Sequence, residues 1–169
     1  MSLDPRQLRD LVVRPALEHI GLWSLAAEQL VMGTAAQESR LTYLAQVGGG
    51  PALGLWQVEP ATHLDIWSNF LRFRKDLRRQ VVALLAPGVP SMGALDLVGA
   101  PGPMALALNL SYAAAMCRVH YYRSKLPLPA EGDVAGMAQR WKESYNTALG
   151  AGKPEEFIRN WRLVEGLYK

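Results

Sequence analysis

Apolar residues at helical spacing, interrupted by prolines and glycines, constrain the fold of this chain more than any other feature of its sequence. The segment 104–125 is the most apolar of these stretches, and Pro127 and Pro129 stop it. The most apolar helix of a helical protein normally lies at its centre. The sequence therefore predicts a mainly α fold with the segment 104–125 as the central core element.

Other helices are marked by their end signals. Asp4 and Pro5 form a good helix start, an acidic N-cap followed by proline, and Gly21 ends this first helix. Ser24 is the expected N-cap of a second helix over residues 25–38. Further helices are expected at 61–69, in a basic stretch that runs to about residue 85 and is closed by Pro87-Gly88, at 134–145 and at 154–167, with a Gly- and Pro-rich loop at 89–103.

The segment 42–58 breaks the helical period. Its centre is Gly48-Gly49-Gly50-Pro51, and glycine permits backbone angles that other residues resist. We expect a short β-hairpin or an irregular flap here. Such a flap would bring Gln57 back beside Glu38, which lies at the end of the second helix.

Length and composition predict one domain over residues 1–169. Half of the 169 residues are hydrophobic, which is enough for a substantial core. Cys117 is the single cysteine, so no internal disulfide can form and the fold must depend on packing. Because Cys117 lies in an apolar helical run, we expect a buried structural thiol rather than a nucleophile.

The charge pattern limits the partners. The chain has 18 basic and 15 acidic residues, a net charge of +3, which permits contact with a polyanion. No nucleic-acid-binding motif is present, and we expect no nucleic-acid partner. The N-terminus lacks a secretory signal, and no apolar stretch approaches the ~20 residues of a membrane span. The three histidines are scattered with no ligands at metal-binding spacing, so no metal or other cofactor is expected.

Three motifs occur in a fixed order along the chain. The first is Gln37-Glu38-Ser39-Arg40-Leu41, the second runs from Gly54 to Thr62 as Gly-Leu-Trp-Gln-Val-Glu-Pro-Ala-Thr, and the third is Ser144-Tyr145-Asn146-Thr147. This order resembles the lytic transglycosylases of the lysozyme-like superfamily (soluble, SLT-type). Those enzymes carry Glu-Ser, then Gly-Leu-x-Gln-hydrophobic-x-Pro-x-Thr, then Ala-Tyr-Asn-Ala-Gly. The residues after Asn146 depart from the last motif.

The resemblance implies a lysozyme-like fold, with helices around a cleft and a small β-hairpin or flap. It implies an enzyme that cleaves the β-1,4 bond between MurNAc and GlcNAc in peptidoglycan, with Glu38 as general acid and then base. The N-acetyl group of the substrate takes the role of a second carboxylate, and the product ends in 1,6-anhydroMurNAc. A lone glutamate near a helix end is usually just solvated, so the assignment depends on the ordered motifs around Glu38.

The same resemblance implies site roles for Ser39, Gln57, Tyr145 and Asn146, and aromatic residues nearby are candidates for stacking on sugars. Ser39 would contribute hydrogen bonds near the acid, and the Gln57 amide would bind an N-acetyl group. The Tyr145 hydroxyl would orient the Glu38 carboxyl. Asn146 would hold the glycan or the local turn. Trp56 would stack on a sugar face or, alternatively, fill the core, and Tyr43 and Trp67 are further stacking candidates.

Two other functions remain open at this point. A muramidase-type hydrolase or endolysin would use Glu59 or Asp65 as a second carboxylate to place a water molecule, although Glu59 also suits a helix N-terminus. A non-catalytic virion structural protein would keep the lysozyme-like fold without turnover.

Trp141-Lys142-x3-Asn146-Thr147, followed by Gly150, Gly152 and Phe157, resembles bacteriophage-encoded members of the group. A phage particle would also supply a route to the wall for a chain that lacks an export signal. We therefore expect a virion-associated protein that acts in the host periplasm and cell wall. Its expected partners are bacterial peptidoglycan and other virion proteins of the tail or internal core. The basic run at residues 72–79 is expected to be a solvated helix face or a surface that binds the wall or a partner protein.

Overall fold

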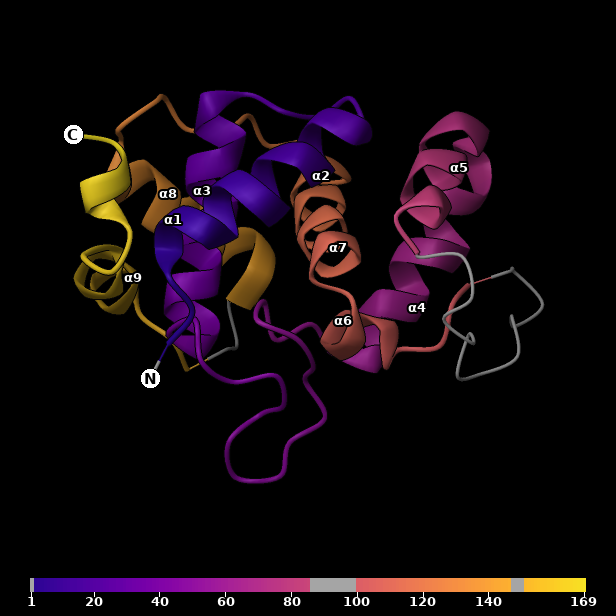
Figure 1. Cartoon of the computed structure of the whole chain (residues 1–169), viewed down its shortest axis with the longest axis horizontal. Helices are drawn as coiled ribbons and strands as arrows, with labels where there is room; N and C mark the ends of the chain where they lie inside the picture. The colour runs from indigo at the N-terminus through magenta and orange to yellow at the C-terminus, as the bar shows by residue number, and fades with distance from the viewer. Residues whose placement is uncertain (1, 86–99, 147–150) are drawn as a thin grey trace.

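The computed structural model describes residues 2–85, 100–146 and 151–169, and these ranges are built mainly of helices (Figure 1). The prediction of a mainly α protein is confirmed for this part of the chain. In order, the elements are α1 (Pro5–Leu8), the π-helix η1 (Arg9–Val13), α2 (Arg14–His19), α3 (Leu25–Ser39), α4 (Pro60–Asn69), the 3-10 helix η2 (Leu71–Phe73), α5 (Lys75–Ala83), α6 (Ala105–Leu108), α7 (Leu110–Tyr122), α8 (Val134–Trp141), the π-helix η3 (Lys142–Asn146), α9 (Pro154–Trp161) and the 3-10 helix η4 (Glu165–Leu167).

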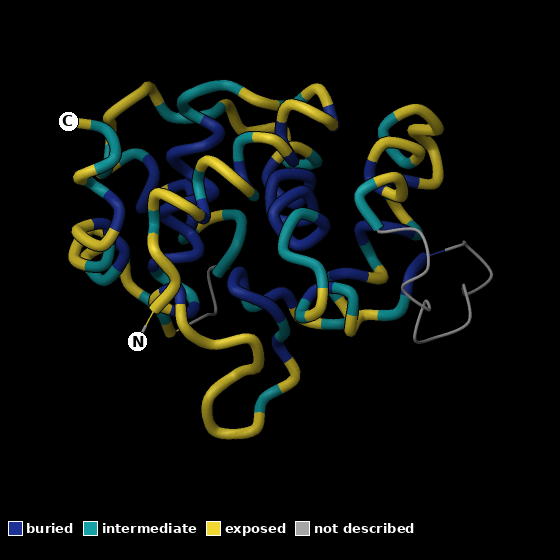
Figure 2. The backbone as a smooth tube through the Cα atoms, in the orientation of Figure 1, coloured by how far each residue is buried: buried dark blue, intermediate teal, exposed yellow. Residues whose placement is uncertain are grey.

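Helix α3 lies in the core and ends at the candidate site. The Ser24 side chain accepts a hydrogen bond from the Ala27 amide, which is the expected N-cap. Residues 27–36 are all buried, so α3 is covered on every side, and it packs against α7, α8 and α9 (Figure 2). A Cβ atom on Gly33 would lie 2.5 Å from the ring of Phe157, so glycine allows α9 to approach closely.

The helix predicted at 104–125 is broken into α6 and α7. Asn109 stands at the break with extended backbone angles, and its Oδ1 accepts a hydrogen bond from the Tyr112 amide at 2.9 Å. Asparagine competes for backbone hydrogen bonds in this way and so begins a new helix. The Asn109 amide also donates to the Leu84 carbonyl. Helix α7 is nevertheless a central element, because residues 112–121 are all buried.

The two C-terminal helices are shorter than predicted. The helix expected at 134–145 is α-helical only to Trp141 and continues as the wider π-helix η3. The helix expected at 154–167 ends at Trp161, and η4 follows. π-Helical turns are rare and occur often at functional sites. Here η3 carries Tyr145 and Asn146. The predicted stop at Pro87-Gly88 and most of the predicted 89–103 loop lie outside the described residues.

Residues 42–58 form an irregular flap, the long purple loop in the lower part of Figure 1. No continuous strand occurs in the described ranges. The flap holds two isolated antiparallel bridges, Ala45 with Leu53 and Leu53 with Val58. Its tip is exposed (Figure 2). Gly48 and Gly49 have φ angles of 89° and 84°, which glycine adopts without strain.

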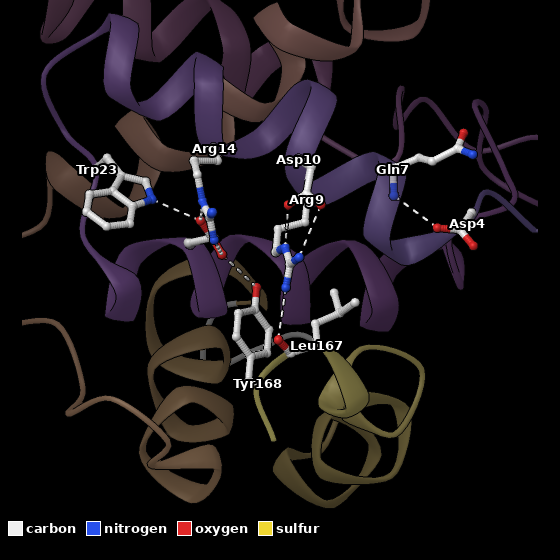
Figure 3. A network of polar contacts seen from close by, with 9 residues as sticks. Asp4, Gln7, Arg9, Asp10, Arg14, Trp23, Leu167 and Tyr168 are labelled. Carbon is white, nitrogen blue, oxygen red and sulfur yellow. Dashed lines mark hydrogen bonds and ion pairs between the residues drawn. The ribbon is translucent and has the colours of Figure 1, made fainter.

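A buried carboxylate ties both ends of the described chain to α3 (Figure 3). Glu28 is fully buried and accepts two hydrogen bonds from Arg14, at 2.8 and 3.1 Å. It also accepts from the Trp23 indole at 2.9 Å and from the Tyr168 hydroxyl at 3.3 Å. A buried charge is tolerated only with such partners. The network therefore stabilises the packing of α2 and the C-terminal residues against α3, the helix that carries Glu38.

The buried side chains form one core cluster that runs from Leu8 in α1 to Val164 after α9. Within the described ranges, no helix has the length and apolar character needed to cross a bilayer.

Candidate active site

A cavity of about 920 Å³ opens at the C-terminal end of α3, between that helix, the flap and η3. It brings together five of the six residues predicted for the site: Glu38, Ser39, Gln57, Tyr145 and Asn146. The other lining residues are Gln37, Arg40, Tyr43, Gln46, Val47, Ala52, Val58, Glu59, Thr62 and His120.

Glu38 has an unusual environment for a carboxyl group. Burial raises its pKa from 4.5 to about 7, because the charged form loses its hydration. The indole Nε1 of Trp141 donates a hydrogen bond to Oε1 at 2.7 Å, which acts in the opposite direction by stabilising the carboxylate. The position in the last turn of α3 also disfavours a negative charge, since the helix dipole is negative at that end. The carboxyl is therefore present in both protonation states near neutral pH.

Trp141 is a site residue that the sequence analysis did not identify as one. Its ring is buried and packs in a tilted arrangement on Phe157, with 6.0 Å between the ring centroids. The available signal was the spacing of four residues between Trp141 and Tyr145, which places both side chains on one side of a helix. The indole reaches Glu38 from across the fold and fixes Oε1, so Oε2 is the oxygen left to carry a proton.

The Tyr145 hydroxyl does not orient the Glu38 carboxyl, in contrast to the prediction. It donates its single proton to the Trp56 carbonyl oxygen at 2.6 Å. The ring stacks on His120 and on Tyr121, at centroid distances of 4.8 and 5.4 Å. Tyr145 thus connects the base of the flap to η3, and Trp141 makes the contact that was expected of Tyr145.

Trp56 is also placed differently from the stacking role predicted for it. Its side chain is fully buried, and the indole Nε1 donates to the Val31 carbonyl at 2.9 Å. A ring in this position cannot stack on a sugar, so the alternative reading as a core residue is correct. Trp67 is likewise buried. Tyr43 is the aromatic side chain of the flap that lines the cavity with an exposed face, 48% of its surface being accessible.

Several lining side chains are held by backbone contacts. The Gln57 amide donates to the Gly54 carbonyl at 2.7 Å, which leaves its Oε1 to accept from a ligand. Ser39 is buried, and its hydroxyl donates to the Ala35 carbonyl one turn earlier. Asn146 accepts a hydrogen bond from the Lys142 ammonium group at 2.9 Å. Gln57 and Asn146 therefore offer polar groups to the cavity, whereas the Ser39 hydroxyl is already used within α3.

Backbone strain in the described ranges is concentrated at this cavity. Among the described residues, three other than glycine have positive φ angles: Arg40 at 50°, Leu41 at 56° and Gln57 at 45°. Arg40 and Gln57 line the cavity, and Leu41 lies next to Arg40. Such strain costs of order 1–3 kcal/mol per residue and is commonly found at ligand sites.

His120 is a second lining residue that the sequence analysis left outside the site. Its Nε2 lies 2.9 Å from the Ser144 carbonyl oxygen and must donate to it, so the ring is the neutral Nε2–H tautomer. Burial lowers the pKa of His120 to about 4, which keeps the ring neutral at physiological pH. Within the described ranges, its buried Nδ1 has no hydrogen-bond partner.

The two candidates for a second carboxylate, Glu59 and Asp65, have different positions relative to the cavity. Glu59 is exposed at the start of α4 and lines the cavity with Glu38. Asp65 is not among the lining residues. It accepts hydrogen bonds from Asn69 and Arg123, which hold its pKa below the usual value. Asp65 is therefore an ion-pair partner of Arg123 outside the cavity lining, and this placement does not favour it as the second carboxylate.

The basic run lies in η2 and α5, and in Figure 1 helix α7 stands between α5 and α3. Arg72 and Arg74 are exposed and lie over the rings of Phe73 and Phe70, at 4.9 and 4.5 Å from the centroids. Arg79 is exposed and pairs with Asp76 in the same helix. None of these arginines lines the cavity.

Comparison with protein-family models, curated proteins and solved structures finds no match to this chain. In residues 2–85, 100–146 and 151–169, no three His, Cys, Asp or Glu side chains gather closely enough to hold a metal ion. The chemistry available in the cavity is that of a carboxyl group with a pKa near 7, supported by polar and aromatic side chains.

Proposed function

We propose that the protein is a lytic transglycosylase that cleaves the MurNAc–GlcNAc β-1,4 bond of peptidoglycan, with Glu38 as its general acid and base. The observation that carries this proposal is the Glu38 carboxyl in the cavity, with a pKa raised to about 7 by burial. An ordinary carboxyl with a pKa of 4.5 would be protonated in roughly one molecule in 300 at pH 7. Glu38 is protonated in about half of the molecules, so it can donate a proton.

In the first step, protonated Glu38 gives its proton to the bridging oxygen as the bond from that oxygen to C1 of MurNAc breaks. The carbonyl oxygen of the substrate's own N-acetyl group attacks C1 and replaces the departing oxygen, as in substrate-assisted glycosidases. The charge that develops on Glu38 is stabilised by the Trp141 indole, which already donates to Oε1.

In the second step, the Glu38 carboxylate removes the proton from the C6 hydroxyl of the same sugar. The C6 oxygen attacks C1 and releases the N-acetyl oxygen, which produces a 1,6-anhydroMurNAc end. Glu38 is protonated again and no water is consumed. One carboxyl thus acts first as acid and then as base, which a pKa near the working pH favours.

The other lining residues fit the binding of a glycan. Gln57 and Asn146 present amide groups for the N-acetyl and hydroxyl groups of the sugars, and the exposed ring of Tyr43 suits stacking on a sugar face. A lysozyme-like fold is part of the proposal, supported by an acid at the end of a buried helix beside a flap. The placement in a phage virion, acting in the host periplasm and cell wall with virion proteins as partners, rests on the motif that contains Trp141 and Asn146.

A muramidase-type hydrolase is the second candidate, and Glu59 is the observation that favours it. Glu59 lines the same cavity as Glu38 and is exposed, so its carboxylate is free to position a water molecule. In that case water rather than the C6 hydroxyl attacks C1, and the product has a reducing end.

The experiment is digestion of purified Gram-negative peptidoglycan by the wild type, Glu38→Gln and Glu59→Gln, with the products analysed by mass spectrometry. Anhydro ends that are lost only in Glu38→Gln support the transglycosylase. Reducing ends that are lost in both variants support the hydrolase. Wild-type turnover by Glu38→Gln, or no soluble product from any of the three proteins, would contradict the proposal, and the second outcome would favour a non-catalytic virion component.

A further inference from the structure

We propose that Arg40 forms a subsite in the cavity that binds carboxylate groups carried by the peptidoglycan strand. The inference rests on the proposed function, because it names a feature of the substrate that the same cavity recognises. It is carried by the backbone conformation of Arg40, by its place in the cavity lining and by the charges of the other lining residues.

The backbone at Arg40 has a conformation that suits glycine better than arginine. Arg40 is the C-cap of α3, with φ 50° and ψ 34°, in the left-handed region. Helices that end in this conformation usually place glycine or asparagine there, since other residues are strained. Leu41 has a similar conformation, but its side chain is buried in the core. Arg40 is exposed, so burial of its side chain does not offset the strain.

Arg40 lines the cavity, and within the described ranges no hydrogen bond or ion pair ties its side chain to the rest of the fold. In those ranges, the one side-chain bond at this residue is from Thr42 to its backbone carbonyl. A guanidinium paired with Glu38 would lower the pKa of that carboxyl, whereas the pKa is raised. Arg40 therefore does not serve as the charge partner of the acid.

Arg40 is the only cationic side chain among the described residues that line the cavity. The carboxyls there are Glu38 and Glu59, and His120 is kept neutral by burial. A guanidinium group binds a carboxylate through two parallel hydrogen bonds. In a peptidoglycan strand, the carboxylates are on the stem peptides or, where the peptide has been removed, on the lactyl group of the muramic acid. The sugars themselves are uncharged, so these groups are the natural ligands of Arg40.

The test compares wild type, Arg40→Gln and the control Arg79→Gln on three forms of the same sacculi. The first form is untreated, the second has its carboxylates converted to neutral amides with carbodiimide and ammonium, and the third has been stripped of peptides by an amidase. Arg79→Gln removes the same charge from α5, away from the cavity.

On untreated sacculi, Arg40→Gln is expected to raise KM roughly fivefold to tenfold, with kcat little changed, and Arg79→Gln to match the wild type. Amidation should cause the same loss for the wild type and no further loss for Arg40→Gln. Stripped sacculi separate the two ligand sources, since retained wild-type activity assigns the lactyl group and lost activity assigns the stem peptide. Equal losses on amidation for the wild type and Arg40→Gln would overturn the subsite.

Binding measured without turnover separates this inference from the proposed function. Glu38→Gln and Glu38→Gln/Arg40→Gln are sedimented with untreated and amidated sacculi, and only the first protein should bind better to the charged form. Full turnover by Glu38→Gln with this binding difference present would refute the function and leave the subsite. No turnover by Glu38→Gln with equal binding by both proteins would refute the subsite and leave the function.

Arg40→Gly tests whether the strained backbone at position 40 is tolerated because the arginine side chain binds the substrate. Glycine relieves the left-handed backbone, so the Tm should rise by roughly 2–4 °C while KM rises as in Arg40→Gln. Arg40→Gln keeps the strain, and its Tm should stay at the wild-type value. A lower Tm in both variants would show that Arg40 supports the fold, and this would contradict the subsite.

Discussion

Replacing Glu38 with glutamine should make the protein more stable at alkaline pH. The side chain is partly buried, and ionisation of its carboxyl removes hydration that the Trp141 indole replaces only in part. Glutamine has nearly the same shape, can accept the same indole hydrogen bond and has no ionised form. The variant therefore avoids the cost of a buried charge that the wild type bears.

The magnitude follows from the two pKa values of the Glu38 carboxyl. Its pKa is about 7 in the folded protein against 4.5 for the ordinary group, so the folded state binds the proton more tightly. The stability that the protonated carboxyl contributes is complete below pH 4.5 and is lost as the pH rises through 7. Since one pKa unit corresponds to about 1.4 kcal/mol, the loss reaches at most about 3 kcal/mol.

The assay is urea unfolding of the wild type and Glu38→Gln at pH 4 and pH 8. The difference in the free energy of unfolding should be below about 0.5 kcal/mol at pH 4 and approach 3 kcal/mol in favour of the variant at pH 8. Glu59→Gln is the matched control, because it removes an exposed carboxyl of the same cavity and should stay within about 0.5 kcal/mol of the wild type. A Glu38→Gln difference that is the same at both pH values would refute the assigned burial of the charge.

Three other substitutions test contacts of the site and of the helix that carries Glu38. Trp141→Phe removes the hydrogen bond that stabilises the carboxylate, so the pKa of Glu38 should rise by about one further unit, and the alkaline limb of the kcat/KM profile should move up with it. Arg14→Met leaves the buried Glu28 without its ion pair and should lower the free energy of unfolding by about 3 kcal/mol in urea titrations. Tyr145→Phe loses the hydrogen bond to the flap carbonyl, and it should reduce the rate of peptidoglycan digestion only in part, because the ring stacking remains.

Trp67→Phe provides the control for Trp141→Phe. It also removes a buried indole that donates a hydrogen bond, in this case to the Tyr112 hydroxyl at 2.9 Å. Its effect on stability should be similar, but the alkaline limb should stay where it is in the wild type. A limb that moves equally in both variants, or moves to lower pH in Trp141→Phe, would contradict the role of the indole at Glu38.

Local signals in the sequence were sufficient to predict α3, the helix that carries Glu38. Ser24 caps α3 as predicted, and Glu38 lies in its last turn. The apolar pattern failed to predict a helix break where a polar side chain forms hydrogen bonds with the backbone. Asn109 lies in an apolar run that looks continuous, yet its side chain bonds to the Tyr112 amide and begins α7. Capping by asparagine is visible in a sequence only when the break is already suspected.

The contacts within the cavity were harder to predict, because they join residues far apart in the chain. Trp141 and Glu38 are 103 positions apart, and the donor to the acid was expected to be the neighbouring Tyr145. Trp56 adjoins Gln57 in the motif, but the two residues face opposite sides of the flap base, one in the core and one in the cavity. Pattern alone identified which segments meet, while packing decided which side chain of each segment reaches the carboxyl.

The missing side chain at Gly33 has a consequence for the acid five residues later in the same helix. The ring of Phe157 occupies the space beside Gly33, and the Trp141 indole packs on that ring. A methyl group at position 33 would displace Phe157, and Trp141 would shift with it relative to Glu38. Glycine at position 33 therefore keeps Phe157 in place, and Phe157 supports the Trp141 ring that donates a hydrogen bond to Glu38. In this way a residue without a side chain affects the pKa of the carboxyl.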